Sequence, residues 1–156
     1  MNPAAAPADL EWRRFDQLPA ALLYDVLRFR QAIFVVEQRC AYPDLDGRDA
    51  CPQHLLLRVG DELAGYLRLI PSADGARVAI GRVAVAAAHR GRGFARRLMD
   101  EALARCRRDY AGRGVTLTAQ TYLVPFYESL GFRAISAPFD DYGLAHVEMV
   151  SSGAGS

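Results

Sequence analysis

Residues 89–97 form a glycine- and arginine-rich stretch, His-Arg-Gly-Arg-Gly-Phe-Ala-Arg-Arg, that limits the local structures open to the chain. It follows a strand-like apolar run at 78–85 and opens a helix-like run that ends near Arg107. A helix start leaves backbone N–H groups without intrahelical partners and carries the positive end of the helix dipole. Gly91 and Gly93 let the chain bend sharply there, and the arginines add permanent positive charge. The stretch therefore predicts a cradle for phosphate.

Two other phosphate-binding loops do not fit this stretch. A Walker loop needs a lysine after its second conserved glycine, and the chain contains no lysine. A dinucleotide-binding fingerprint needs a third glycine and an early place in a βαβ unit, whereas residue 95 is alanine. The ligand of this predicted phosphate cradle must therefore be inferred from motifs elsewhere in the chain.

Composition is that of a globular protein, because 51% of the 156 residues are hydrophobic and 24% are charged. We expect one domain at 10–150, with disordered ends at 1–9 and 151–156. A net charge of +1 argues against a nucleic-acid partner. The first residues do not resemble a signal peptide, and no run is long enough for a membrane span. We therefore expect a cytoplasmic protein without membrane contact.

Hydrophobic periodicity predicts a mixed α/β (α+β) fold. An apolar stripe from Pro19 to Phe34 predicts a helix, and a polar loop follows at 37–53. A second helix begins in the glycine-rich stretch, and a short third helix at 123–130 ends at Gly131. Strand-like runs lie at 10–15, 54–59, 63–70, 78–85, 115–120, 133–138 and 146–150.

A second motif lies further along the chain, where Ala119-Gln120 precedes Phe126-Tyr127 and then Gly131-Phe132. This motif and the pattern Arg90-x-x-Gly93-x-Ala95 resemble the two acyl-CoA segments of the GNAT superfamily of N-acetyltransferases. The run at 80–85 is similar to the central strand of that superfamily, whose backbone runs beside the pantetheine arm.

The chain most resembles the ElaA-like acetyltransferases within that superfamily. The resemblance covers residues 10–150, nearly the whole chain. Beyond the two acyl-CoA segments and the central strand, it is carried by Phe34-Val35-Val36-Glu37-Gln38, Tyr42-Pro43-Asp44-Leu45-Asp46-Gly47, His54 and Gly143-(x)2-His146-(x)2-Met149.

The resemblance implies the GNAT acyl-CoA N-acyltransferase fold, a mixed, mostly antiparallel sheet that is splayed at its centre and flanked by helices. It implies an N-acetyltransferase that takes acetyl-CoA as co-substrate, uses no metal, and acetylates an amine of a small molecule or a peptide. Pairing of sheet edges in a homodimer would suit such a fold. The residues expected to contact the CoA molecule are Val83, Ala84, Val85, Arg90, Gly91, Arg92, Gly93, Phe94, Ala95, Gln120 and Phe126.

Acetyl transfer from a thioester needs a polarised carbonyl, a protonated leaving sulfur and a neutral amine. The resemblance implies that a backbone N–H at 83–85 binds the thioester oxygen and that Tyr127 protonates the departing sulfur. A phenol of ordinary pKa, near ~10, holds its proton at neutral pH. Glu37 and His146 are the leading candidates for the base that deprotonates the amine. The weaker candidates are His54 and Glu148.

The loop that follows Glu37 is acidic, because it carries Asp44, Asp46 and Asp49. Such a cluster would attract a cationic amine, although acidic loops between elements are common. We expect the acceptor to be bound by Glu37, Asp44, Asp46 and His54.

Metal sites are not indicated by the sequence. The spacing Asp44-x-Asp46-Gly47 lacks the bidentate glutamate that an EF-hand requires. Cys40, Cys51 and His54 match no closed four-ligand zinc site. We expect these cysteines and Cys106 to be reduced thiols.

Two other functions remain open. The pattern Arg30-(x)3-Phe34, with Glu37 and Asp46-(x)2-Asp49, also resembles acyl-homoserine-lactone synthases, which use acyl chains and S-adenosylmethionine. The chain is short for that family, and its phosphate signature is more typical of acetyl-CoA enzymes. The other alternative is a non-catalytic acyl-CoA sensor, against which the presence of Tyr127 argues.

Overall fold

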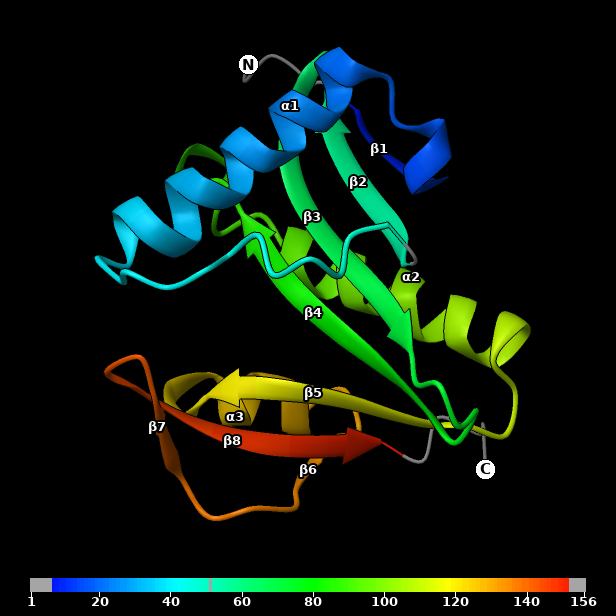
Figure 1. The fold of residues 1–156 in the computed structure, drawn as a ribbon, viewed down its shortest axis with the longest axis vertical. Helices are drawn as coiled ribbons and strands as arrows, with labels where there is room; N and C mark the ends of the chain where they lie inside the picture. Colours follow the sequence, from blue (N-terminus) through cyan, green and yellow to red (C-terminus); the bar gives the residue numbers. More distant parts are fainter. Residues whose placement is uncertain (1–6, 51, 152–156) are drawn as a thin grey trace, which may run out of the picture.

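The computed structural model describes residues 7–50 and 52–151 (Figure 1). In this part of the chain, eight strands form one sheet in the order β1-β2-β3-β4-β5-β8-β6, and β7 pairs with β8. Every pair is antiparallel except β4 with β5. The strands are β1 (Ala8–Arg14), β2 (Gln53–Val59), β3 (Glu62–Pro71), β4 (Arg77–Val85), β5 (Gly114–Gln120), β6 (Arg133–Ala134), β7 (Phe139–Asp141) and β8 (Leu144–Ser151).

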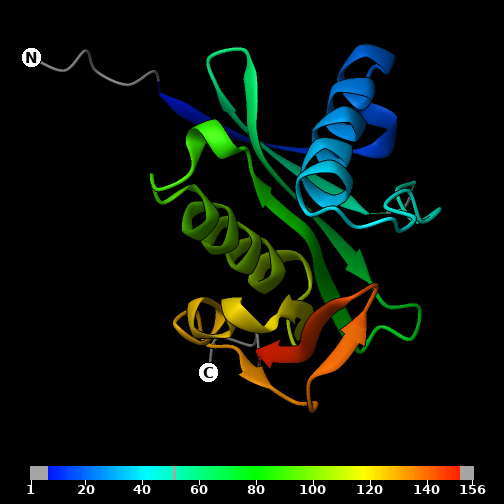
Figure 2. The same cartoon turned by 90° about the vertical axis from the view of Figure 1, so that its left-hand side faces the viewer.

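Helices cover both faces of the sheet, with α1 on one side and α2 on the other (Figure 2). The helix α1 continues directly into a π-helical segment, η2, and the short α3 follows β5. No helix in the described ranges combines the length and apolar character that a bilayer crossing needs. The helical segments are η1 (Phe15–Gln17), α1 (Ala20–Arg30), η2 (Gln31–Glu37), η3 (Ala87–His89), α2 (Phe94–Asp109), η4 (Thr121–Leu123) and α3 (Val124–Glu128).

The core consists of two apolar layers because β2 and β3 are buried on both faces. Leu55 and Leu57 belong to the cluster that contains Leu98 and Met99 of α2. Leu56, between them, packs on the other side in a cluster with Val26 of α1 and Tyr66. Alternate residues of a strand point to opposite faces, so the continuous apolar run in β2 serves both layers.

The mixed, mostly antiparallel sheet flanked by helices is the architecture that the sequence predicts. Three boundaries differ. First, β1 begins at Ala8 and β8 ends at Ser151, so residues 8, 9 and 151 belong to the sheet rather than to disordered ends. Residues 1–6 and 152–156 lie outside the described part. Second, only two residues of the run 133–138 pair with β8. Third, residues 139–141 form a short strand, β7, that is absent from the predicted runs and pairs with β8 in a hairpin.

The centre of the sheet is open between its two parallel strands. The pairing of β4 with β5 is limited to residues 77–79 and 114–116, and the strands then diverge (Figure 1). On the other side of β4, its register with β3 shifts between Tyr66 and Arg68, which marks a β-bulge. The splayed sheet centre expected from the resemblance is therefore present in the fold.

Candidate active site

A cavity of about 600 Å³ lies where β4 and β5 separate. Residues 80–85 of β4 and 117–120 of β5 form two of its walls. The other lining residues come from η2 and the loop after it, from Arg90 and Ala95, from η4 and α3, and from the β7–β8 hairpin. Strand backbone that diverges from its neighbour has N–H and C=O groups free to bind a ligand. This cavity brings together parts of the chain that are far apart in sequence.

The predicted phosphate cradle has the expected backbone geometry. Gly91 and Gly93 have φ values of 78° and 76°, which are left-handed and favour glycine. Gly93 is the N-cap of α2, and the helix has neither a side-chain cap nor an acidic residue in its first turn. The first N–H groups and the helix dipole are therefore available to an anion.

The side chains of this segment take different places. Arg90 and Ala95 line the cavity, whereas residues 91–94 do not. Phe94 is buried in the main core, so only its backbone is available for the CoA contact expected from the resemblance. The guanidinium of Arg92 lies 4.8 Å from the centre of the Phe94 ring.

His89 is a residue of this loop that the sequence interpretation missed. It is buried, and its Nδ1 accepts a hydrogen bond from Arg92 at 3.0 Å. Because Arg can only donate, the ring proton of neutral His89 sits on Nε2, which lies 3.3 Å from Glu62. His89 therefore fixes the position of an arginine beside the predicted phosphate cradle.

Tyr127 lies on α3, lines the cavity and is 7% exposed. Its ring makes edge contacts with Phe126 and Phe132, with centroid distances of 5.1 and 6.2 Å. Burial raises the pKa of the Tyr127 phenol to about 12, with a smaller contribution from Tyr122. The phenol is therefore fully protonated at neutral pH and can act as a proton donor.

His146 reaches the cavity from β8, where it pairs in register with Gln120 of β5. Its Nδ1 lies 2.8 Å from the backbone carbonyl oxygen of Leu144. A carbonyl can only accept, so Nδ1 carries the proton and Nε2 of the neutral ring keeps its lone pair. Phe139 stacks on the ring at 6.2 Å. His146 therefore has an oriented ring with one basic nitrogen.

Glu37, the other leading base candidate, ends η2 and also lines the cavity. Its carboxylate forms an ion pair of 2.6 Å with Arg90, and the Arg90 Nε donates to the carbonyl oxygen of Val85 at 3.0 Å. The adjacent Gln38 accepts a hydrogen bond from Gln120. These contacts connect η2 to β4, β5 and the cradle.

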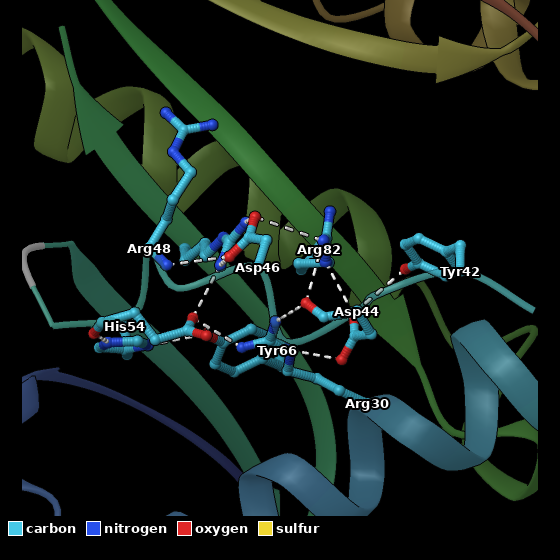
Figure 3. Close-up of polar contacts among 10 residues, drawn as sticks. Arg30, Tyr42, Asp44, Asp46, Arg48, His54, Tyr66 and Arg82 are labelled. Atoms are coloured by element: carbon cyan, nitrogen blue, oxygen red, sulfur yellow. Dashed lines mark hydrogen bonds and ion pairs between the residues drawn. The ribbon is translucent and has the colours of Figure 1, made fainter. Parts of the chain in front are cut away.

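The acidic loop differs most from expectation (Figure 3). Asp44 bonds Arg30 and Arg82 at 3.1 and 2.7 Å. Asp46 bonds Arg68. Partial burial alone would raise the pKa of Asp46, but the contact with Arg68 outweighs it and lowers the pKa to about 2.

The third carboxylate, that of Asp49, bonds Arg30 and Arg68. Arg30, Arg68 and Arg82 therefore neutralise all three carboxylates of this loop. Neither Asp44 nor Asp46 lines the cavity. This corrects the expectation that the loop offers free negative charge to an amine.

His54 is also a structural residue rather than an acceptor contact. It is 1% exposed and does not line the cavity. Its Nε2 lies 3.0 Å from the carbonyl oxygen of Asp49, and its Nδ1 lies 2.6 Å from the Tyr66 hydroxyl. Burial lowers the pKa of His54, so the ring is neutral and connects β2 to the acidic loop.

Unusual backbone conformations gather around the cavity. In the described residues, Arg39, Arg82 and Tyr142 are the non-glycine residues with positive φ, at 50°, 55° and 51°. Arg82 and Tyr142 line the cavity, and Arg39 lies between two lining residues. Left-handed backbone is unfavourable for side chains with a Cβ and concentrates at functional sites. The sequence contains no signal for these three positions.

Among the residues that the structure describes, no group of three or more His, Cys, Asp or Glu side chains could hold a metal ion. Cys40 and Cys106 are free, buried thiols. Cys40 donates to the carbonyl oxygen of Tyr142 at 3.4 Å, which joins the acidic loop to the β7–β8 hairpin. Cys51 lies outside the described residues.

Comparison with known proteins gives consistent matches. The family model of the acetyltransferase (GNAT) domain matches residues 35–152. Escherichia coli ElaA is 37% identical over 145 residues, which cover 90% of this chain and 95% of ElaA. The crystal structure of E. coli ElaA has a TM-score of 0.88 at 35% identity and covers 93% of this chain and 99% of that chain.

Two further solved structures are informative. An acyl-CoA N-acyltransferase from Pseudomonas aeruginosa has a TM-score of 0.87 at 32% identity, covering 93% of this chain and 99% of that chain. A CoA-dependent acyl-homoserine lactone synthase has a TM-score of 0.78, covering 92% of this chain and 82% of that chain, but at 19% identity it shares the fold alone. The GNAT fold predicted from the sequence is confirmed.

Proposed function

Because this chain belongs to the GNAT acetyltransferase family, we propose that it is an acetyl-CoA-dependent N-acetyltransferase whose acceptor is a primary amine of a small molecule or a peptide. The observation that carries this proposal is the position of Tyr127 and His146 in one cavity beside the open edge of β4. One side chain can donate a proton, and the other can accept one. We also propose a cytoplasmic location and a homodimer formed through a sheet edge.

Acetyl-CoA would bind with its diphosphate on the backbone N–H groups at 91–95, at the start of α2. The left-handed glycines and the uncapped helix start support this placement. Arg90 lies beside this site and can add a charge-assisted hydrogen bond. The pantetheine arm would then follow the backbone of Val83 to Val85 into the cavity.

In the reaction, a backbone N–H of β4 would bind the thioester oxygen as negative charge develops on it. The neutral amine attacks the thioester carbon, so a C–N bond forms and the C–S bond breaks. His146 Nε2 takes a proton from the amine, and the Tyr127 hydroxyl gives one to the sulfur. The products are an N-acetyl amide and CoA as its free thiol.

The acceptor would enter beside the β7–β8 hairpin. Asp141 on this hairpin lines the cavity, and its carboxylate has no bonding partner among residues 7–50 and 52–151. It therefore replaces the loop aspartates as the free negative charge that can attract a cationic amine. Tyr42 and Tyr142, whose ring centroids are 5.7 Å apart, flank this end of the cavity.

Calorimetric titration with acetyl-CoA at neutral pH, followed by a panel of amines in an assay of free-thiol release, tests the proposal. We expect saturable binding of one acetyl-CoA per chain and amine-dependent thiol release. The absence of saturable binding would overturn the proposal. Binding without thiol release for any amine would instead favour a non-catalytic acyl-CoA sensor. Acyl-carrier-protein thioesters with S-adenosylmethionine give the matching assay for lactone synthesis.

A further inference from the structure

Arg82 occupies an unusual position in the central strand of the site. Between β3 and β4, Gly81 pairs with Arg68 and Ala84 pairs with Tyr66, so β4 contains one residue more than β3 over this interval. Arg82 lies in this bulge with a φ of 55°. Glycine would adopt that conformation without a steric penalty, whereas arginine does not. The side chain of Arg82 must therefore offset the unfavourable backbone.

The Arg82 guanidinium is held by several groups at once (Figure 3). Its Nε donates to Oδ1 of Asp44 at 2.7 Å, and its Nη2 donates to the Asp44 backbone oxygen at 3.1 Å. A weaker contact of 3.5 Å joins Nη2 to Asp46. The guanidinium also lies 5.4 Å from the ring centre of Tyr42. We call the bonds between Arg82 and Asp44 the Arg82–Asp44 clamp.

The other half of the clamp is itself immobilised. Asp44 is 5% exposed, and its second carboxylate oxygen accepts from Nε of Arg30 at 3.1 Å. Arg30 is fully buried at the end of α1 and also donates to the Asp44 backbone oxygen at 2.9 Å. The clamp therefore connects the bulge in β4, through Asp44, to the end of α1.

We propose that Arg82 is a positioning residue: the Arg82–Asp44 clamp fixes the bulge and thereby the direction of the next N–H, that of Val83, toward the thioester oxygen. This inference rests on the proposed acetyltransferase function. Val83 lines the cavity directly after the bulge. A hydrogen-bond donor stabilises developing charge only if it is already aligned, so a loosened bulge lowers the rate of acetyl transfer more than the affinity for acetyl-CoA.

The substitution Arg82→Gly separates positioning from folding. Glycine accepts the left-handed backbone, so the variant loses the clamp without adding strain. We expect kcat to fall by about 10- to 100-fold, somewhat less than when an oxyanion donor is deleted. The Kd for acetyl-CoA should stay within about twofold of wild type, since the diphosphate contacts are unchanged. Arg77→Gly, an exposed position of the same strand before the bulge, is the matched control.

Infrared difference spectroscopy measures the hydrogen bond from the Val83 N–H to the thioester oxygen. The measured quantity is the carbonyl stretching frequency of bound acetyl-CoA that carries ¹³C at the thioester carbon. In wild type and in Arg77→Gly we expect a lower frequency than for free acetyl-CoA, and in Arg82→Gly a return toward the free value. If Arg82→Gly does not fold, Arg82→Lys provides the test, because an ammonium cannot reproduce the forked contact with Asp44.

The outcomes separate this inference from the function on which it rests. A wild-type kcat and a wild-type carbonyl frequency in both Arg82 variants would overturn the positioning role while leaving the acetyltransferase function intact. A wild-type protein whose bound thioester has the frequency of free acetyl-CoA would overturn the proposed use of the β4 backbone, and this inference with it.

Discussion

The carboxylate of Glu37 lies 2.6 Å from the guanidinium of Arg90, so the end of η2 is joined to the loop that precedes α2. Both side chains are partly exposed, at 38% and 46%, and such a pair contributes little to stability. The ion pair between Glu37 and Arg90 instead changes the charge that each side chain offers to a ligand. The Glu37 carboxylate is already engaged by Arg90, and that arginine is the one beside the predicted diphosphate site.

We therefore expect Glu37→Gln and His146→Asn to have very different effects on amine-dependent thiol release. The first should keep kcat within about threefold and tighten acetyl-CoA binding slightly, because Arg90 regains its full charge. The second should lower kcat by about 100-fold or more, as the loss of a general base does.

Steady-state kinetics measure kcat for the two variants at pH ~7.5, where histidine is largely neutral. Calorimetric titration measures the acetyl-CoA affinity of each variant. A severe loss of kcat in Glu37→Gln with a nearly normal His146→Asn would assign the base to Glu37 instead.

Tyr127→Phe should lower kcat by about 100-fold while acetyl-CoA affinity is retained, because the ring keeps its packing and only the proton donor is lost. The raised pKa, about 12, means that the phenol stays protonated well beyond neutral pH. The ratio of wild-type to variant kcat should therefore be constant from about pH 7 to 10. Tyr122→Phe, at an exposed cavity residue, is the control. A ratio that declines as the pH rises from about 9 to 10 would mean that the phenol titrates with an ordinary pKa.

Gly93→Ala should weaken acetyl-CoA binding by about tenfold or more, because an added Cβ would occupy the space in which the diphosphate approaches the backbone. No described atom other than its chain neighbours lies within 4 Å of that Cβ, so the protein itself has room for it. Gly112→Ala is the matched control, with a φ of 81° and equally open surroundings in the turn after α2.

Both alanine variants should lose about 1–2 kcal/mol of unfolding free energy to left-handed backbone strain. Calorimetric titration and chemical denaturation measure the two effects separately. Equal acetyl-CoA affinities in the two variants would contradict the placement of the diphosphate at the start of α2.

The Asp46 carboxylate should contribute to stability in a way that depends on pH. Its pKa in the folded protein is about 2, below the ordinary value of 3.8, so the folded state binds the proton less tightly than the unfolded state. The contribution is therefore present above pH 3.8 and is lost as the pH falls toward 2. Asp46→Asn should cost about 1–2 kcal/mol at neutral pH, and the difference from wild type should shrink toward pH 2.

Denaturation curves at several pH values test this, with Asp61→Asn at the exposed β2–β3 turn as control. A cost for Asp46→Asn that stays constant down to about pH 2 would show that its arginine contacts do not stabilise the charged form.

The sequence predicts the elements whose patterns are local. The glycine-rich stretch, the apolar run of β2 and the Tyr127 segment each have a periodicity or spacing that indicates their structure, and the fold has them as expected. The acidic loop was misjudged because its charge is balanced by Arg30, Arg68 and Arg82, which come from three other elements. Ion pairs between residues so distant in sequence follow from the tertiary fold and leave no local pattern.

The same reason explains what was missed around the cavity. The left-handed conformation of Arg82 depends on the offset between β3 and β4, and the assignment of the ring proton in His146 depends on a carbonyl two residues away. Neither follows from residue type. Glu37 lines the cavity, and its pairing with Arg90 follows only from the fold.

A crystal structure of the protein with bound acetyl-CoA would show where the ligand lies. We predict the diphosphate on the backbone N–H groups of residues 91–95 and the thioester oxygen on the β4 backbone at Val83, between Tyr127 and His146. A CoA molecule bound elsewhere, with those N–H groups directed to solvent, would contradict this account.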